Sequence, residues 1–117
     1  MNKKILVVDD DVDILEIVSM VLEEKGYSIV KSLTSDVLDE LGVINPDLII
    51  LDNTIGACSG SELCKELKAN DSQKHIPVIL CSAVDDLDMI SKSCKANTFL
   101  AKPFNLNELD KVVASMI

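Results

Sequence analysis

The sequence predicts a single α/β domain built on a parallel β-sheet with helices on both faces. Apolar, strand-like runs alternate with helix-like segments five times along 117 residues, without exception. Strands that are covered on both faces are almost continuously apolar, and several of these runs have that character. Successive parallel strands joined by right-handed crossover helices form a doubly wound sheet. At this length the chain holds one domain, which we assign to residues 1–117.

Apolar periodicity and breaker residues place the elements. The predicted strands are residues 4–8, 27–31, 47–51, 76–81 and 98–101. The predicted helices are residues 12–25, 35–43, 59–69, 84–94 and 105 to the C-terminal region. Gly26 is expected to end the first helix. Ser59 with Glu62, and Asn105 with Glu108, have the spacing of a capping box and are expected to open the third and fifth helices.

Composition excludes several classes of function. A net charge of -9 opposes binding to a phosphate backbone, and only Tyr27, Phe99 and Phe104 are aromatic, so direct nucleic-acid binding is not expected. The four cysteines form no CxxC pair and His75 is the only histidine, which argues against zinc and redox motifs. No apolar run reaches the roughly 20 residues of a membrane span. We therefore expect a cytoplasmic protein with reduced thiols and no membrane contact.

Polar side chains stand where four of the predicted strands end. Asp9 and Asp10 follow the first strand, Asp52 follows the third, Ser82 the fourth and Lys102 the fifth. The carboxyl ends of parallel strands share one edge of the sheet, where ligands bind in open α/β folds. The sequence therefore predicts a site that gathers three carboxylates, a hydroxyl and an ammonium group.

This combination of groups favours a hard cation and phosphoryl chemistry. Adjacent carboxylates repel one another unless a cation compensates them. A site with oxygen ligands alone suits Mg²⁺, which leaves room for phosphate oxygens, and does not suit zinc. One carboxylate could then attack a phosphoryl group and form an aspartyl phosphate. Lys102 and the Ser82 hydroxyl would hold the phosphoryl oxygens.

Some of these residues also have structural interpretations. Asp11 and Asp13 are expected to serve the first helix as its cap and its first-turn acid. Ser82 has N-cap spacing with Asp85, so it could cap the fourth helix as well as bind phosphate. Lys102 taken alone could be a solvated lysine, but it directly precedes Pro103, which fits a fixed turn and a cis peptide bond.

The chain resembles a two-component response-regulator receiver domain from Lys3 to its end. The resemblance rests on Val7-Val8-Asp9-Asp10, on Leu51-Asp52 with Gly60 eight residues after the aspartate, on Ser82-Ala83, and on Lys102-Pro103-Phe104. Four such motifs in order, each at a strand end, are specific together although each alone is weak. The resemblance implies a flavodoxin-like fold with the five strands in the order 2-1-3-4-5.

The resemblance also implies a role for each matching position. Asp52 would be the phosphoacceptor, Asp10 a direct Mg²⁺ ligand and Asp9 a ligand mainly through water. The Thr54 carbonyl would complete the protein ligands.

The remaining matches concern the response to phosphorylation. Ser82 and Lys102 would bind phosphoryl oxygens, and Phe99 occupies the aromatic switch position. Phosphorylation would then change the face formed by the fourth helix, the fifth strand and the fifth helix.

Three residues depart from the usual family pattern. Gly56 stands where proline is common and is expected to loosen the loop that carries Thr54. Phe99 lacks the hydroxyl of the common tyrosine, which weakens a two-state switch. Lys95 replaces a common glycine, which is unfavourable if that position needs a positive φ. Because neither Thr54 nor Val84 positions a water well, we expect slow self-dephosphorylation.

The leading hypothesis is a signalling module rather than an enzyme with a separate substrate. Asp52 would accept a phosphoryl group from a sensor histidine kinase or a histidine phosphotransfer protein, and the chain would catalyse only its own phosphorylation and dephosphorylation, as a monomer or a weak phosphorylation-dependent dimer. Its downstream protein partner is unknown. The alternative is a non-phosphorylated interaction domain, or pseudo-receiver. A hydrolase like the haloacid dehalogenases is disfavoured because Asp52-Asn53-Thr54 lacks that group's second aspartate.

Overall fold

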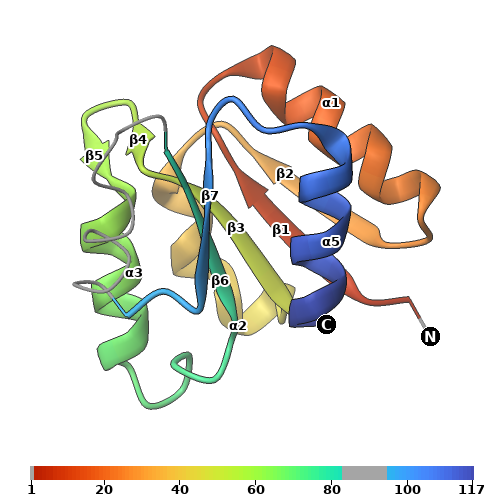
Figure 1. The fold of residues 1–117 in the computed structure, drawn as a ribbon. Helices are drawn as coiled ribbons and strands as arrows, with labels where there is room; N and C mark the ends of the chain where they lie inside the picture. Colours follow the sequence, from red (N-terminus) through yellow and green to blue (C-terminus); the bar gives the residue numbers. More distant parts are fainter. Residues whose placement is uncertain (1, 83–94) are drawn as a thin grey trace.

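A parallel sheet forms the centre of the domain in the computed structural model, which describes residues 2–82 and 95–117. Its strands are β1 (Lys4–Val8), β2 (Ser28–Ser32), β3 (Leu48–Asp52), β6 (Val78–Ser82) and β7 (Thr98–Ala101). They lie in the order β2-β1-β3-β6-β7 (Figure 1), and every pairing between them is parallel. This is the predicted 2-1-3-4-5 order, so the doubly wound, flavodoxin-like fold is confirmed.

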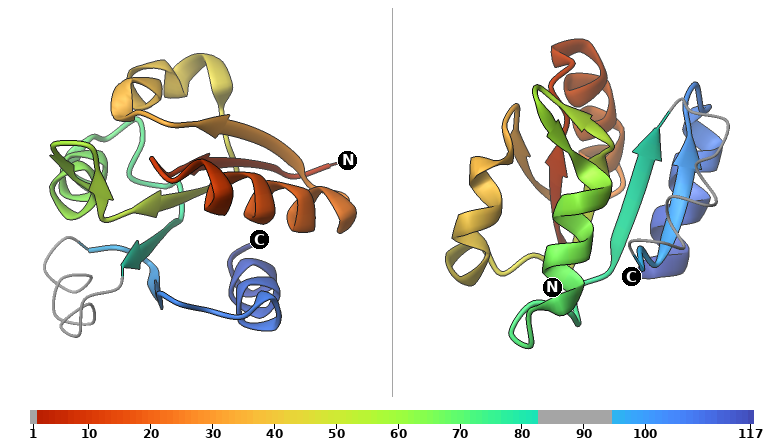
Figure 2. Two further views of the ribbon diagram at one scale, coloured as in Figure 1. Left: turned by 90° about the horizontal axis from the view of Figure 1, so that it is seen from above. Right: turned by 90° about the vertical axis from the view of Figure 1, so that its left-hand side faces the viewer.

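Helices cover both faces of the sheet, as Figure 2 shows. The helical segments are α1 (Val12–Glu24), the 3₁₀ helix η1 (Ser35–Glu40), α2 (Leu41–Ile44), α3 (Gly60–Ala69) and α5 (Leu106–Met116). One face is covered by α1 and α5, and the other by η1, α2 and α3. The predicted helix 84–94 lies outside the described residues. No helix in the described ranges combines the length and the apolar character of a membrane span.

The central strand β3 divides the core into two apolar layers. All five of its residues are buried. Successive side chains of a strand point to opposite faces, so Leu48 and Ile50 pack in the layer of α1 and α5, whereas Ile49 and Leu51 pack in the layer of η1, α2 and α3. Burial on both faces explains the uninterrupted apolar sequence and fixes the position of Asp52, where the strand ends.

Two predicted elements differ from the structure by more than one residue at an end. Residues 35–43 were expected to form one helix, but a 3₁₀ helix over Ser35–Glu40 precedes the short α2. A 3₁₀ helix has three residues per turn, which places Leu38 and Leu41 above one another, and both are buried against the sheet. The fourth sheet strand starts at Val78 rather than Ile76, because Pro77 has no N–H to donate to a neighbouring strand.

Most helix ends follow the predicted signals. The Asp11 side chain caps α1 by accepting from the Asp13 and Ile14 amides, and Gly26 follows the helix with a φ of 97°. The Asn105 side chain caps α5 by accepting from the Glu108 amide at 2.8 Å. These caps confirm the assignment of Asp11 to α1 rather than to the carboxylate site.

Lys95 has a φ of 63°, the left-handed conformation that a residue with a Cβ adopts at a cost. Lys95→Gly is therefore expected to raise the free energy of unfolding by roughly 1 kcal/mol, measured by urea denaturation. Lys3→Gly is a suitable control, because Lys3 is exposed and lacks a positive φ. Equal effects of the two substitutions would contradict this explanation.

Candidate functional site

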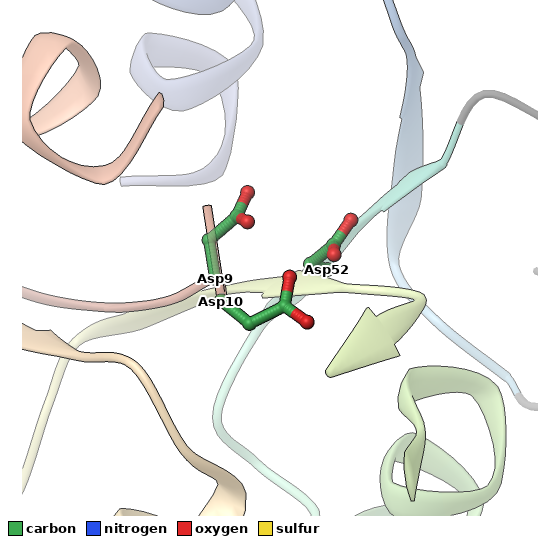
Figure 3. A group of neighbouring side chains, drawn as sticks. All are labelled: Asp9, Asp10 and Asp52. Carbon is green, nitrogen blue, oxygen red and sulfur yellow. The ribbon is translucent and has the colours of Figure 1, made fainter. Parts of the chain in front are cut away.

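Three aspartates meet at the carboxyl edge of the sheet (Figure 3). Asp9 and Asp10 directly follow β1, and Asp52 is the last residue of the neighbouring strand β3. One carboxylate oxygen from each lies within 4.8 Å of those of the other two. Asp9 and Asp52 are 5% and 7% exposed, whereas Asp10 lies at the surface. The structure therefore gathers the three predicted carboxylates at one point.

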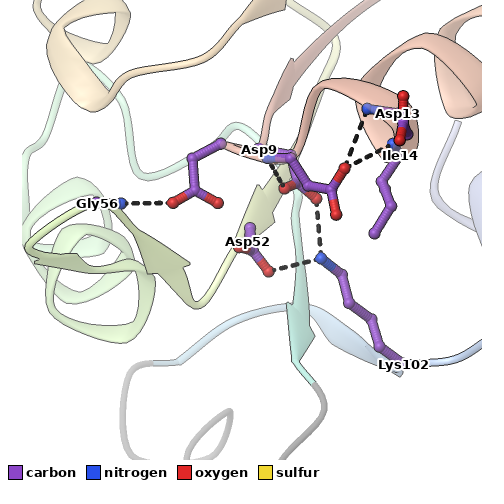
Figure 4. A network of polar contacts seen from close by, with 8 residues as sticks. Asp9, Asp13, Ile14, Asp52, Gly56 and Lys102 are labelled. Carbon is purple, nitrogen blue, oxygen red and sulfur yellow. Dashed lines mark hydrogen bonds and ion pairs between the residues drawn. The ribbon is translucent and has the colours of Figure 1, made fainter.

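Lys102 joins two of these aspartates (Figure 4). Its Nζ lies 2.9 Å from Asp9 Oδ2 and 2.9 Å from Asp52 Oδ1. The backbone N–H of Lys102 donates to the Ser82 carbonyl at 2.9 Å, which fixes this residue beside the end of β6, and the predicted cis Lys102-Pro103 peptide bond is present. Lys102 is thus not an ordinary solvated lysine, since it supplies positive charge to two buried carboxylates.

The pKa values of this cluster reflect competing effects. Burial raises the pKa of Asp52 above its ordinary 3.8, and repulsion from Asp9 and Asp10 adds to that effect against the opposing hydrogen bond from Lys102. Burial alone would lower the pKa of Lys102, but its hydrogen bonds to Asp9 and Asp52 outweigh burial and raise it. The raised pKa of Lys102 favours its charged form, whereas the raised pKa of Asp52 makes its ionisation less favourable than in the unfolded chain.

Asp52→Asn is expected to stabilise the metal-free protein at neutral pH. The raised pKa means that Asp52 favours folding while protonated, below its ordinary 3.8, and that this contribution is lost as the pH rises through its folded-state pKa. In urea unfolding, the difference between variant and unmodified protein should vanish below pH 3.8 and grow above it. Saturating Mg²⁺ should reduce the difference, and a difference independent of pH would contradict the argument.

The Cys81 thiol lies among the same charges but has no chemical role there. Burial raises its pKa to about 12, so the sulfur remains protonated. Cys81 and Cys64 are buried, as expected of small core residues.

Asn53 is a residue of this region that the sequence analysis missed. The predicted capping box at Ser59 is wrong in its side-chain contact, because the Ser59 hydroxyl bonds the Ser61 hydroxyl instead of capping the helix. The Asn53 side chain accepts from the Ser61 amide at 3.0 Å and so caps α3 from a different segment. The Asn53 carbonyl also accepts from the Gly60 amide at 2.7 Å, which ties the start of α3 to the end of β3.

The loop that follows Asp52 is a small hairpin rather than the loosened loop expected from Gly56. Strands β4 (Thr54–Ile55) and β5 (Cys58–Ser59) pair antiparallel around a two-residue turn. Gly56 has a φ of 60° at the first turn position, as in the type II′ turns of tight hairpins. Proline could not adopt this φ, so glycine here permits an ordered hairpin.

The other predicted site residues lie at or near this edge. Ser82 is the buried last residue of β6, level with Ala101 at the end of β7. Thr54 begins β4 and is exposed, two residues after Asp52. Phe99 lies on β7 with 36% of its surface exposed, outside the carboxylate cluster.

The donor set at this edge fits a hard divalent cation. It offers three carboxylates and, among the described residues grouped there, no nitrogen or sulfur ligand. Repulsion from Asp9 and Asp10 raises the pKa of Asp52, and a bound cation would relieve that repulsion. Mg²⁺ binds through one or two carboxylates and retains waters, which an open, surface-facing Asp10 allows. The cluster therefore forms an acidic pocket that could hold a metal.

A parallel sheet of this order carries an acidic pocket and a bridging lysine at its carboxyl edge. The family model for the response regulator receiver domain matches residues 5–114. The chain belongs to this family, as its sequence motifs indicated.

Individual relatives agree with this assignment. The chain is 37% identical to sporulation initiation phosphotransferase F of Bacillus subtilis, over 97% of this chain and 92% of that protein. It is 30% identical to the alkaline phosphatase synthesis transcriptional regulatory protein PhoP of B. subtilis, but spans only 49% of that protein's length.

Solved structures show the same architecture. Chemotaxis response regulator CheY4 of Vibrio cholerae matches with a TM-score of 0.91 and 25% identity, over 100% of both chains. The signal receiver domain of a histidine kinase from Syntrophus aciditrophicus matches with a TM-score of 0.89 and 31% identity, over 97% of this chain and 89% of that one.

Proposed function

We propose that residues 1–117 act as one receiver domain that accepts a phosphoryl group on Asp52 from a phosphohistidine of a sensor kinase or phosphotransfer protein. The observation that carries this proposal is the contact of Lys102 with both Asp9 and Asp52 inside an acidic pocket. A carboxylate oxygen of Asp52 attacks phosphorus, the P–N bond breaks, and the imidazole leaves with the bonding electron pair and takes up a proton. Both oxygens of the Asp52 carboxylate are then accounted for, one as the bridging oxygen of the acyl phosphate and one as a carbonyl.

The surrounding residues prepare Asp52 for this transfer. Asp9, Asp10, Asp52 and the Thr54 carbonyl would hold Mg²⁺, which when bound supplies positive charge to the transferring phosphoryl oxygens. Lys102 stands 2.9 Å from Asp52 Oδ1 and can turn from that oxygen to a phosphoryl oxygen while keeping its charge. The Ser82 hydroxyl, at the end of the adjacent strand β6, is the proposed donor to another phosphoryl oxygen.

Phosphorylation is proposed to be read out at β7 and the elements beside it. Ser82 is the last residue of β6 and Lys102 directly follows β7, so phosphoryl binding would pull on these two strands directly. Phe99 is exposed on β7, and it would change its packing when Ser82 moves toward the phosphoryl group. A downstream protein, or a second copy in a weak dimer, would bind the altered face. The slow self-dephosphorylation expected from Thr54 and Val84 is part of this proposal.

An apolar groove beside Lys102 suits the protein that carries the phosphohistidine. Its volume is about 390 Å³, between α1 and the segment that follows β7. Apart from Lys102, its lining residues are Ile14, Ile17, Val18, Pro103, Phe104 and Leu106. Ile17 and Leu106 are 47% and 44% exposed. Because the groove includes the lysine that contacts Asp52, a protein seated there would bring its histidine to the acceptor.

Phosphorylation with two donors tests the proposal. With Mg²⁺ and a small acyl phosphate, the protein should gain one phosphoryl group by mass spectrometry, and Asp52→Ala should gain none. Asp71→Ala is the matched control, since Asp71 is an exposed carboxylate paired with Lys74, and it should behave as the unmodified protein. Ile17→Asp should keep the acyl phosphate reaction but slow transfer from a histidine phosphotransfer protein about tenfold. A protein that gains no phosphoryl group would instead be the non-phosphorylated interaction domain.

A further inference from the structure

The turn of the β4–β5 hairpin contacts the carboxylate site. The Gly56 N–H donates to Asp10 Oδ2 at 2.8 Å (Figure 4), although 46 residues separate the two in sequence. Gly56 adopts a φ of 60° in this turn. A residue with a Cβ is disfavoured at this φ, and proline has no N–H to donate.

Asp10 depends on this contact more than the other two aspartates do. Asp9 is buried, receives the Asp11 amide at 2.9 Å and pairs with Lys102. Asp52 is buried and also pairs with Lys102. Asp10 is exposed, and within the described ranges Gly56 is its one hydrogen-bond donor. Without that amide, the Asp10 side chain would be free to rotate into solvent.

We propose that the Gly56 amide is a positioning group for metal binding, which holds Asp10 in its ligand position before the cation arrives. This inference rests on the proposed Mg²⁺ site and adds to it the group that orders the exposed ligand. Asp10 Oδ2 accepts from the Gly56 amide. With this bond present, one oxygen each from Asp9, Asp10 and Asp52 lie within 4.8 Å of one another. The hydrogen bond therefore holds the Asp10 carboxylate where one of its oxygens is within ligand distance of those of Asp9 and Asp52.

The contact also links the two segments that supply surface-facing ligands. Asp10 follows β1, while Thr54, the proposed carbonyl ligand, begins the hairpin that carries Gly56. Holding one segment against the other before binding reduces the entropy that the cation must otherwise remove. The departure from proline at position 56 thus supplies a hydrogen-bond donor as well as the positive φ of the hairpin turn.

Replacement of the single N–H tests this inference. Ligation at Cys58 joins residues 1–57 to 58–117 and allows glycolic acid in place of Gly56, which exchanges the N–H for an ester oxygen in a backbone of nearly the same shape. D-alanine at position 56 is the matched control, because it keeps the N–H and favours a positive φ. Calorimetric titration with Mg²⁺ should give a dissociation constant about fivefold higher for the ester and within roughly twofold of the unmodified value for D-alanine.

A measurement without metal gives an independent readout. In metal-free protein the Gly56 amide proton should resonate downfield and exchange slowly, and Asp10→Ala should shift it upfield and speed its exchange. An ester that binds Mg²⁺ as tightly as the unmodified protein, or more tightly, would overturn the inference, as would a Gly56 amide that does not respond to Asp10→Ala. An unmodified protein that binds no Mg²⁺ would instead overturn the proposed metal site.

Discussion

Lys102→Ala is expected to lower the free energy of unfolding of the metal-free protein by about 3 kcal/mol at neutral pH. The substitution leaves Asp9 and Asp52 buried without the ammonium group that lies 2.9 Å from each. Removal of one partner from a buried ion pair costs more than the pair itself contributes, because the remaining charge stays desolvated. The raised pKa of Lys102 means that its contribution is fully present below pH 10.5 and is lost as the pH rises through the folded-state pKa.

The same variant should be phosphorylated by an acyl phosphate about 100-fold more slowly, as measured by mass spectrometry over time. Lys31→Ala is the matched control, because the Lys31–Glu16 pair has a similar length of 3.0 Å but is exposed to solvent. That control should lose less than about 1 kcal/mol of stability and no phosphorylation rate. Similar stability losses in the two variants would contradict the special role of Lys102, and an unchanged rate would contradict its proposed contact with phosphoryl oxygens.

The sequence predicted those parts of the site that the sheet itself determines. Asp52 follows a run of apolar residues whose burial on both faces requires a central strand, so its position at the strand end follows from local pattern alone. Asp9 and Lys102 were placed by the same reasoning, since all parallel strands end at one edge. The pattern could not show that Lys102 contacts both aspartates. That contact depends on how far the lysine after β7 reaches across the sheet toward the ends of β1 and β3.

Contacts made through backbone amides and loops were beyond the sequence pattern. The local spacing favoured Ser59 as the cap of α3. In the structure the Ser61 amide donates to the Asn53 side chain, which lies before the hairpin, and the Ser59 hydroxyl bonds the Ser61 hydroxyl instead. Gly56 was identified as unusual, but a missing side chain indicates only freedom of φ. Its bond to Asp10 depends on a segment 46 residues away, which no local pattern indicates.

Gly60→Ala is expected to be the most damaging substitution of a glycine in this chain. A Cβ at Gly60 would overlap the Asp52 carbonyl oxygen and lie 2.8 Å from the Asn53 Cα and 2.9 Å from the Asp52 carbonyl carbon. These are backbone atoms, so relief requires α3 to move away from the end of β3. That movement breaks the 2.7 Å hydrogen bond from the Gly60 amide to the Asn53 carbonyl. We expect a loss of about 3 kcal/mol in the free energy of unfolding, measured by urea denaturation.

Phosphorylation of Gly60→Ala should slow beyond what the loss of stability explains, because the atoms that the methyl group displaces belong to Asp52 itself. A displacement of about 1 Å at a reacting group lowers rates by about 100-fold. Gly42→Ala is the matched control, since a Cβ there meets nothing within 4 Å and Gly42 lies in the helix α2. Replacing this helical glycine should stabilise the protein by roughly 0.5 kcal/mol and leave phosphorylation unchanged. The rate should be measured without denaturant, where Gly60→Ala is folded. A normal phosphorylation rate there would contradict the expectation that the packing of α3 against Asp52 affects the reaction.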